Sequence, residues 1–184
     1  MAHVPSQPYV SLEDFWAAEE TSDMRHEWLD GVVYDMSRES VEHGRLVGAI
    51  MGELGIALKG KCAVYASCVM LYVAETKFCT YADGSVVCGS PATYRVAKLE
   101  EALTNPALLV EVLSDSTEKY DRGEKFAHYM RIPSLQEYVL VSQHERRIEV
   151  YGRPQHGRWI HEMAEAGESL TLHGCVINVD AVYA

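Results

Sequence analysis

The sequence predicts an α/β fold built on a sheet of mixed strand direction. Runs rich in β-branched and aromatic residues suit strands, and between them lie segments whose apolar residues recur every three or four positions, as on one face of a helix. The order of these segments is helix, hairpin, helix, three strands, helix and three further strands. Strands that alternate with helices in this way indicate an α/β sheet.

The length of the chain, 184 residues, is typical of one domain. We expect residues 1–10 to form a loose N-terminal arm and residues 11–184 a single domain, since 48% of all residues are apolar. The longest apolar run, residues 68–74, is far shorter than the roughly 18 residues that a membrane span needs. The first residues do not have the pattern of a secretory signal. A cytoplasmic location without a membrane partner is therefore the default expectation.

A short helix and a hairpin are expected first. Ser11 can cap a helix, and Asp14 lies at the capping-box position. Two β-prone runs follow within residues 27–34, on either side of Asp30-Gly31. That dipeptide indicates a tight turn, because glycine accepts the positive φ that such a turn requires.

A long helix is expected over about residues 41–58, since Val47, Ile50, Leu54 and Leu58 recur at helical spacing. Gly60 lies just past its end, where a left-handed cap would fall. Residues 63–73, 81–88 and 108–114 are strand candidates.

A third helix is expected to begin at Asp121, which can act as the cap, with Glu124 at the capping-box position. It should run to about Arg131 and stop before Pro133. Residues 137–142, 147–151 and 159–163 are the remaining strand candidates.

Five cysteines are scattered along the chain without any Cys-x-x-Cys spacing: Cys62, Cys68, Cys79, Cys88 and Cys175. A zinc site needs clustered ligands, so none is expected here. Cys68 and Cys88 lie in strand-like runs, where a reduced cysteine usually serves as a small core residue.

The net charge is −11, from 16 basic and 27 acidic residues. Such a balance argues against a protein that coats nucleic acid without specificity, because that function needs many phosphate contacts from a basic face. It does not exclude a nuclease, since acids that hold a divalent cation are negative until the metal arrives. Any contact with DNA must then be local. Basic residues concentrate between residues 119 and 131, at Lys119, Arg122, Lys125 and Arg131.

Glu111 interrupts the apolar strand candidate at residues 108–114. Alternate residues of a strand share a face, so Glu111 points with Leu109 and Leu113. A lone carboxylate removed from water is costly unless it is paired or holds a metal. The alternative is that this face is the solvent side of an edge strand, or that an arginine pairs with Glu111.

Asp83 and Lys125 are the natural partners of Glu111. Two carboxylates on neighbouring strands can supply the oxygen ligands that Mg²⁺ prefers, although an Asp-Gly pair near a strand end is often a turn. Lys125 shares a helix face with Asp121 and Tyr129 and could stabilise charge that develops on a phosphate. Spacing alone equally allows an exposed ion pair between Asp121 and Lys125.

Several blocks of the sequence resemble the Uma family of restriction-endonuclease-like proteins, in the PD-(D/E)XK nuclease superfamily. The blocks are residues 81–88, 105–114, 116–125 and 132–141, and Glu27-Trp28-Leu29-Asp30-Gly31 and His43 match the opening of that family. The resemblance extends from about Ser11 to Tyr183. It departs from the usual motif at Ala82, where proline is common, and at Gly84, where a larger apolar residue is common.

The resemblance implies a restriction-endonuclease-like fold with a mixed central sheet flanked by helices. Asp83, Glu111 and the main-chain carbonyl of Val112 would bind Mg²⁺ or Mn²⁺. The lysine expected two residues after Glu111 is Leu113 here, and the resemblance suggests that Lys125 replaces it.

Supporting roles are expected for three further residues. Glu27 would be an additional acid near the site, and Tyr129 would support it. His43 could orient a water or contact DNA, or could be only a polar residue at a helix end. A homodimer on double-stranded DNA is the expected assembly, with Lys119, Arg122 and Arg131 as its phosphate contacts.

Three interpretations follow. The first is a metal-dependent endonuclease, and the second is a degenerate nuclease fold kept as a DNA- or protein-binding module, which the acidic charge and the missing local lysine favour. The third is a metal-independent acid/base hydrolase such as a glycosidase, which leaves the block around Lys125 unexplained. Dependence on metal separates the first from the third, and binding without cleavage separates the second from the first.

Overall fold

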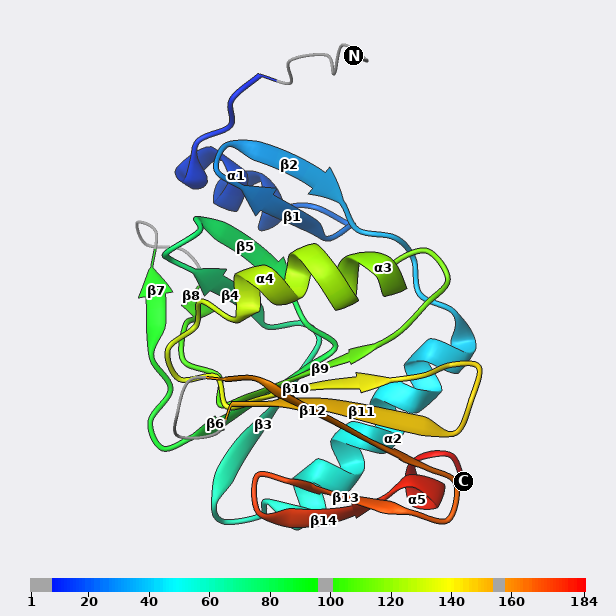
Figure 1. The fold of residues 1–184 in the computed structure, drawn as a ribbon. Helices are drawn as coiled ribbons and strands as arrows, with labels where there is room; N and C mark the ends of the chain where they lie inside the picture. The colour runs from blue at the N-terminus through cyan, green and yellow to red at the C-terminus, as the bar shows by residue number, and fades with distance from the viewer. Residues whose placement is uncertain (1–7, 96–100, 154–157) are drawn as a thin grey trace.

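A computed structural model describes residues 8–95, 101–153 and 158–184 and confirms a mixed α/β fold (Figure 1). Within those ranges the helices are α1 (Leu12–Glu19), α2 (Val41–Ala57), α3 (Glu118–Tyr120), α4 (Phe126–Tyr129) and α5 (Val179–Val182), and a π-helical turn, η1 (Asp121–Lys125), joins α3 to α4. The strands are β1 (His26–Leu29), β2 (Val32–Asp35), β3 (Cys62–Ala66), β4 (Met70–Val73), β5 (Phe78–Tyr81), β6 (Gly84–Cys88), β7 (Thr93–Arg95), β8 (Glu101–Leu103), β9 (Leu108–Val112), β10 (Glu137–Val141), β11 (Arg147–Gly152), β12 (Ile160–Glu165), β13 (Ser169–Leu172) and β14 (Cys175–Asn178). No helix in the described part of the chain is both long and apolar enough to cross a membrane.

The strands divide between two mixed sheets and a separate hairpin. The first sheet has the order β2-β1-β5-β4-β8-β7, the second has the order β12-β11-β10-β9-β6-β3, and β13 pairs with β14. Strands β4 and β8 are parallel, as are β9 and β10, and the other pairs are antiparallel. The strand candidate at residues 81–88 is in fact two strands, because the chain leaves the first sheet after Tyr81 and enters the second at Gly84.

The first helix and hairpin form as the sequence predicts. The Ser11 side chain accepts a hydrogen bond from the Asp14 N–H at the start of α1. Asp30 and Gly31 turn β1 into β2 with φ values of 41° and 98°. The Val10 N–H donates to the Gly31 carbonyl at 2.9 Å, so the end of the expected arm is bound to the hairpin. Residues 1–7 of that arm lie outside the described residues.

The long helix α2 covers one face of the second sheet (Figure 1). Its buried stripe is Leu46, Ile50 and Leu54, continued by Leu58 just past the helix end, whereas Val47 is only half-buried. These side chains pack against the second sheet, and each fully buried leucine or isoleucine contributes about 1.5–3 kcal/mol.

The segment α3-η1-α4 packs between the two sheets (Figure 1). Phe126 and Tyr129 of α4 share one buried cluster with Leu109 and Leu140 of the second sheet and with Leu71 of the first. The opposite face of the first sheet is covered by α1. The connection from β5 to β6 therefore runs past the inner helical segment, which places Asp83 deep in the molecule.

The start of this inner segment differs from the prediction. Asp121 was expected to cap a helix, but α3 already begins at Glu118 and Asp121 lies within the π-helical turn, buried at 4% exposure. The Tyr138 hydroxyl donates to the Asp121 carbonyl at 3.0 Å. A carbonyl bonded by a side chain in this way is compatible with the wider turn of a π-helix, a feature frequent at functional sites.

The expectation that the cysteines are reduced and scattered is wrong for two of them. Cys62 and Cys88 occupy facing positions of β3 and β6 and form a disulfide. Because 26 residues separate them, the sequence does not indicate this disulfide, which depends on the register between β3 and β6. Cys68, Cys79 and Cys175 are free thiols.

Candidate active site

Asp83 lies opposite Glu111 because of the register between β6 and β9. Gly84 pairs with Val110, Ser85 with Leu109 and Val86 with Leu108, so one further step brings Asp83 to Glu111. The Asp83 carboxylate accepts the Val112 N–H at 2.7 Å, and the Asp83 N–H points at Glu111 Oε2 at 3.4 Å. The turn into β6 fixes both acids at the end of one strand pair.

Glycine at position 84 has a packing cause. A Cβ added there would collide with the Met51 side chain of α2. The departure from the larger residue common in the family therefore follows from how closely α2 packs on this strand.

Glu111 is buried at 4% exposure, and both oxygens of its carboxylate accept hydrogen bonds, Oε2 the longer one, from the Asp83 N–H. Its Oε1 accepts the Tyr129 hydroxyl at 2.8 Å and lies 3.0 Å from Lys125 Nζ. Burial raises the pKa of Glu111 well above its ordinary value, and repulsion from Asp83 and Asp121 adds to this, while Lys125 opposes it. The alternative of a solvent-facing Glu111 on an edge strand is thereby excluded.

Lys125 is likewise buried at 4% exposure, so the alternative of an exposed ion pair is wrong. Its Nζ donates to the Tyr81 carbonyl at 3.2 Å and lies 3.7 Å from Glu27 and 3.8 Å from Asp121. Burial disfavours the charged ammonium, but attraction from the surrounding carboxylates outweighs it and raises the Lys125 pKa. Leu113, at the usual lysine position, packs in the buried cluster instead.

Glu27 joins the site from β1, where the resemblance places an additional acid. It is buried and accepts the Tyr120 hydroxyl at 2.7 Å and the Thr80 hydroxyl. With both oxygens bonded and Lys125 nearby, Glu27 anchors the lysine.

His43 belongs to the site and not merely to the helix end. The cap of α2 is Ser40, whose hydroxyl accepts the His43 N–H at 3.0 Å. His43 Nε2 lies 3.0 Å from Asp83 Oδ2, and Nδ1 lies 3.4 Å from Glu39. Burial tends to lower the His43 pKa, but Asp83, Glu39 and a hydrogen bond to the Val112 backbone together raise it.

Two features of the site were not predicted from the sequence: the presence of Glu39, and the position of Asp121 beside the buried Lys125. Glu39, His43 and Asp83 each offer one ligand atom, and these atoms lie within 4.8 Å of one another. Glu39 precedes the α2 cap, and only the approach of that cap to Asp83 reveals it. Asp121 carried a signal, its helical spacing to Lys125, but that spacing equally allowed an exposed ion pair, and Glu124 three residues later suggested a helix cap.

The charges of the site are unbalanced in favour of a cation. Three buried carboxylates, of Glu27, Glu111 and Asp121, lie around one buried ammonium, that of Lys125, and a fourth, of Asp83, lies beside Glu111. Buried charge without a partner is costly, and hard oxygen ligands suit Mg²⁺ or Mn²⁺. The donor set therefore fits a divalent cation.

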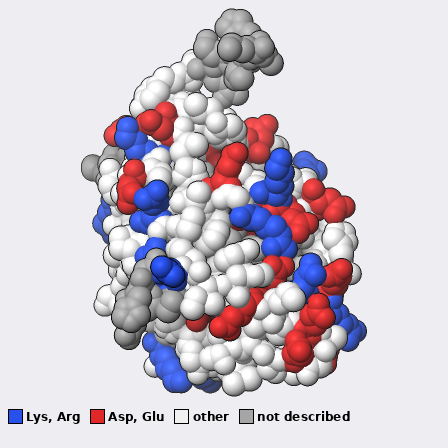
Figure 2. Space-filling model, in the orientation of Figure 1, with Lys and Arg blue, Asp and Glu red and all other residues white. Residues whose placement is uncertain are grey.

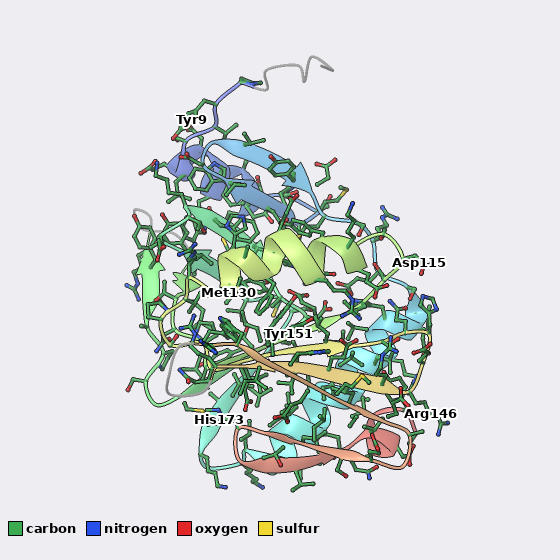
Figure 3. All side chains as sticks on the ribbon, viewed as in Figure 1. Tyr9, Asp115, Met130, Arg146, Tyr151 and His173 are labelled. Atoms are coloured by element: carbon green, nitrogen blue, oxygen red, sulfur yellow. A yellow bond between two sulfur atoms is a disulfide. The ribbon has the colours of Figure 1, made fainter. Side chains whose placement is uncertain are left out.

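The acids open onto a cleft of about 570 Å³. Its lining combines Glu27, Asp83, Glu111, Asp121 and Lys125 with Arg38, His144 and hydroxyl and amide groups: Ser37, Ser40, Ser114, Ser116, Thr117 and Gln143. Asp115, on the loop between β9 and α3, also belongs to the rim (Figure 3). A cleft of this size, closed by acids and edged with hydrogen-bond donors, can admit a phosphate group.

The three basic residues that were expected to contact phosphate lie outside the cleft. Lys119, Arg122 and Arg131 do not line the cleft. Arg122 donates to both Glu149 oxygens at 2.7 and 3.0 Å and to Glu118, and Arg131 lies 3.3 Å from Glu75. Figure 2 shows basic and acidic side chains interspersed on one face of the molecule. None of these three residues therefore adds a positive charge to the cleft lining, and their contact with DNA stays a prediction.

Comparison with known proteins agrees with the fold and with the resemblance seen in the sequence. Residues 12–179 match the Uma2 family, described as "Putative restriction endonuclease". Two uncharacterized proteins of Synechocystis sp. (strain ATCC 27184 / PCC 6803 / Kazusa) are similar: slr1290 at 35% identity over 100% of this chain and 97% of its own length, and sll1609 at 28% over 87% and 90%. The crystal structure of a putative nuclease belonging to DUF820 from Anabaena variabilis ATCC 29413 matches with a TM-score of 0.70 at 15% identity, over 88% of this chain and 91% of that one. Since the family match spans nearly the whole chain and slr1290 aligns along its full length, the chain belongs to the Uma2 family.

Proposed function

We propose that this member of the Uma2 family is an endonuclease that hydrolyses phosphodiester bonds in DNA with Mg²⁺ or Mn²⁺. The observation that carries the proposal is the cluster of four buried carboxylates, three of them around Lys125, at the floor of an open cleft. Lys125 also argues against a degenerate fold, because its Nζ lies 3.0 Å from Glu111 Oε1 and could serve in place of the absent motif lysine.

The proposed metal ligands are Asp83, Glu111 and the Val112 carbonyl, with His43 and Glu39 beside them. Glu111 Oε1 is engaged by Tyr129 and Lys125, whereas Oε2 accepts the 3.4 Å bond from the Asp83 N–H, so Oε2 is the oxygen more open to a cation. Asp83 Oδ2 is engaged by Val112 and His43, which leaves Oδ1. When bound, the cation would polarise the phosphate and lower the pKa of a coordinated water.

The chain's own groups would prepare this chemistry in three ways. Tyr129 fixes the orientation of Glu111 through its hydroxyl. Glu27 and Asp121 keep Lys125 charged, and its ammonium can offset the negative charge that grows on the phosphate during attack. His43, hydrogen-bonded to Asp83, holds that carboxylate in place and lies close enough to take up or give a proton at the cleft.

Metal binding and cleavage test this proposal together. Calorimetry with Mg²⁺ or Mn²⁺ should give one binding event that Asp83→Ala or Glu111→Ala abolishes, while Asp115→Ala, an exposed acid on the same rim, binds normally. Plasmid nicking should need the same metal and be lost with EDTA. Unchanged binding in both acid variants would place the site elsewhere, and hydrolysis of a glycoside without metal would favour the acid/base hydrolase.

We further propose that a homodimer acts on double-stranded DNA, with phosphate contacts from the cleft rim. A net charge of −11 leaves one copy few positive contacts, and a two-fold dimer doubles them and sets two sites against opposite strands. Arg38 and His144 line the cleft, so Arg38→Glu should weaken duplex binding in Ca²⁺ and reduce its salt dependence. Sedimentation as a monomer at micromolar concentration, with no duplex binding at low salt, would refute the dimer.

A further inference from the structure

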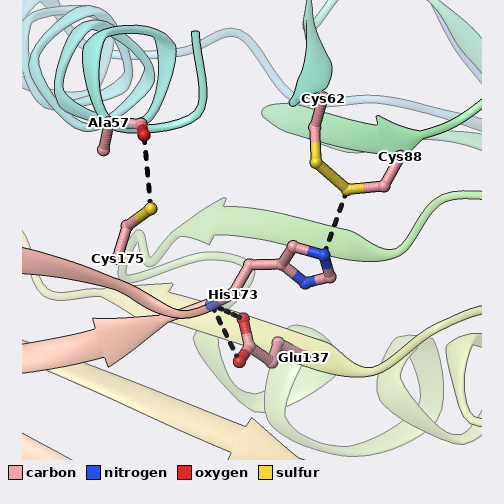
Figure 4. Close-up of a disulfide and its surroundings, with 6 residues drawn as sticks. All are labelled: Ala57, Cys62, Cys88, Glu137, His173 and Cys175. Carbon is pink, nitrogen blue, oxygen red and sulfur yellow. Dashed lines mark hydrogen bonds between the residues drawn. A yellow bond between two sulfur atoms is a disulfide. The ribbon is translucent and has the colours of Figure 1, made fainter. Parts of the chain in front are cut away.

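Three potential metal ligands meet on the side of the molecule away from the cleft (Figure 4). Cys62 lies on the edge strand β3, Cys88 ends β6, and His173 lies in the turn between β13 and β14. Their ligand atoms are all within 4.8 Å of one another. Residues 62, 88 and 173 are far apart in the sequence, so no spacing motif predicts that they form one group.

The backbone conformation of His173 and its hydrogen bonds to Glu137 fix its position. Its backbone has a φ of 48°, a left-handed conformation that is uncommon outside glycine. The His173 N–H donates to both carboxylate oxygens of Glu137, at 3.0 and 2.8 Å. This places the imidazole Nε2 at 3.1 Å from Cys88 Sγ. A disulfide across two strands needs no imidazole beside it, whereas a metal site with two thiolates does need further donors.

We propose that, once the Cys62–Cys88 bond is reduced, Cys62, Cys88 and His173 bind one Zn²⁺. Two thiolates and one imidazole are a ligand set that zinc accepts, with water in the fourth tetrahedral position. Thiolates also select against Mg²⁺ and Ca²⁺, which prefer oxygen. The site is thereby chemically distinct from the oxygen-rich cleft.

The reaction is a thiol–disulfide exchange followed by metal binding. A dithiol reductant attacks the Sγ of Cys88, which is the more exposed residue of the pair, and the Sγ–Sγ bond breaks. The reductant leaves as its own disulfide, and two electrons and two protons remain on Cys62 and Cys88 as thiols. Zn²⁺ then displaces both thiol protons, as metal binding to cysteine requires.

The positions fit a tetrahedral centre after a small rearrangement. With Zn–S bonds of about 2.3 Å and a Zn–N bond of about 2.0–2.1 Å, the two sulfurs should lie about 3.8 Å apart and each about 3.5 Å from the nitrogen. The 3.1 Å between Cys88 Sγ and His173 Nε2 is already near that value. The two sulfurs must separate, and Cys62 Sγ, which lies within 4.8 Å of the imidazole ligand atom, must take its place around the metal; reduction frees both sulfurs to move.

A zinc ion there would connect the edge strand of the second sheet to the hairpin β13–β14. None of the three ligands lines the cleft, so the site would stabilise this part of the fold and take no part in hydrolysis. Zinc binding should therefore raise the melting temperature of the reduced protein.

Cobalt spectroscopy on the full chain tests the proposal. The protein is reduced with a phosphine, desalted without oxygen and titrated with Co²⁺, which reports thiolate ligands through a sulfur-to-metal charge-transfer band. We expect one equivalent of Co²⁺ to give that band, one equivalent of Zn²⁺ to remove it, and the oxidised protein to give none. The cleft residues include no cysteine, so Co²⁺ bound there cannot produce the band.

Matched variants separate this site from the other thiols. Cys88→Ser should abolish the band, and His173→Ala should weaken Zn²⁺ binding about tenfold or more, as loss of groups around a metal does. Cys68→Ser, which removes an exposed free thiol, should leave both unchanged. The proposal fails if the reduced wild type gives no charge-transfer band, if the disulfide resists the phosphine, or if His173→Ala binds Zn²⁺ as tightly as the wild type.

Discussion

Replacing Lys125 by methionine removes the only ammonium among the buried carboxylates of the cleft floor. The lysine is 4% exposed and lies 3.0 Å from Glu111, 3.7 Å from Glu27 and 3.8 Å from Asp121. Methionine keeps most of the side-chain length and apolar contact but not the charge. Because the Lys125 pKa is raised in the folded protein, its stabilisation is fully present below the ordinary lysine value of about 10.4 and is lost only as pH rises through the folded value.

The expected loss is large at neutral pH. Removing one partner of a buried charge pair typically costs about 3–5 kcal/mol, because the remaining charges stay buried without compensation. For a chain of 184 residues, each kcal/mol lowers the melting temperature by about 2–4 °C, so Lys125→Met should melt roughly 6–20 °C lower. An exposed ion pair between Asp121 and Lys125, which the spacing also allows, would instead contribute little, and its loss would leave the stability almost unchanged.

Urea unfolding at pH 7 in EDTA measures the effect, with Lys77→Met as the matched control. Lys77 makes an exposed ion pair with Asp30 at 2.9 Å, with side-chain exposures of 60% and 58%, and its loss should cost at most about 1 kcal/mol. The midpoint should fall strongly for Lys125→Met with an unchanged slope. If both variants lose the same small amount, the carboxylates around Lys125 are not buried charges and the reasoning is refuted.

Three further predictions concern the surrounding fold. Glu149→Gln should cost about 1.5–3 kcal/mol at pH 7, as expected for hydrogen bonds to charged groups. Hydrogen bonding from Arg122, ahead of that from His161, lowers the Glu149 pKa despite burial. This stabilisation therefore exists above about pH 4.3 and disappears as pH falls through the folded pKa value. In a pH series, the urea midpoints of the variant and the wild type should converge in acid. Gly48→Ala should raise the unfolding free energy by up to about 1 kcal/mol, because an added Cβ on α2 meets nothing within 4 Å, and a fall would show an unrecognised contact. Leu54→Ala, which empties a fully buried position under the second sheet, should cost about 2–5 kcal/mol in the same assay.

Local signals predicted the elements whose cause is local. The cap at Ser11, the turn at Asp30-Gly31 and most of the α2 stripe each depend on neighbours within a few residues, and the structure confirms them. The alternation of strands and helices predicted the mixed fold for the same reason. Glu111 could be singled out because a single acid in an apolar strand is conspicuous in any context.

Features that depend on the register between distant strands could not be predicted. The chain crosses between the two sheets from β3 to β4 and again from β5 to β6, inside the runs 63–73 and 81–88 that each resemble a single strand in the sequence. The disulfide exists because Cys62 faces Cys88 across β3 and β6, although 26 residues separate them. Strands β7 and β8, each of three residues, are too short to carry a periodic signal.

The density of basic residues along the sequence does not predict which of them lie in the site. Lys119, Arg122 and Arg131 suggested a phosphate-binding strip, but a helix distributes such residues over several faces, and Arg122 turns inward to Glu149. Lys125, four residues from Asp121, was the one cation of that run to enter the site, because the same helix face carries Tyr129 against Glu111. A buried acid therefore selects its cation by the face it shares in the fold, and the carboxylates left without one are those to which the proposed function assigns the metal.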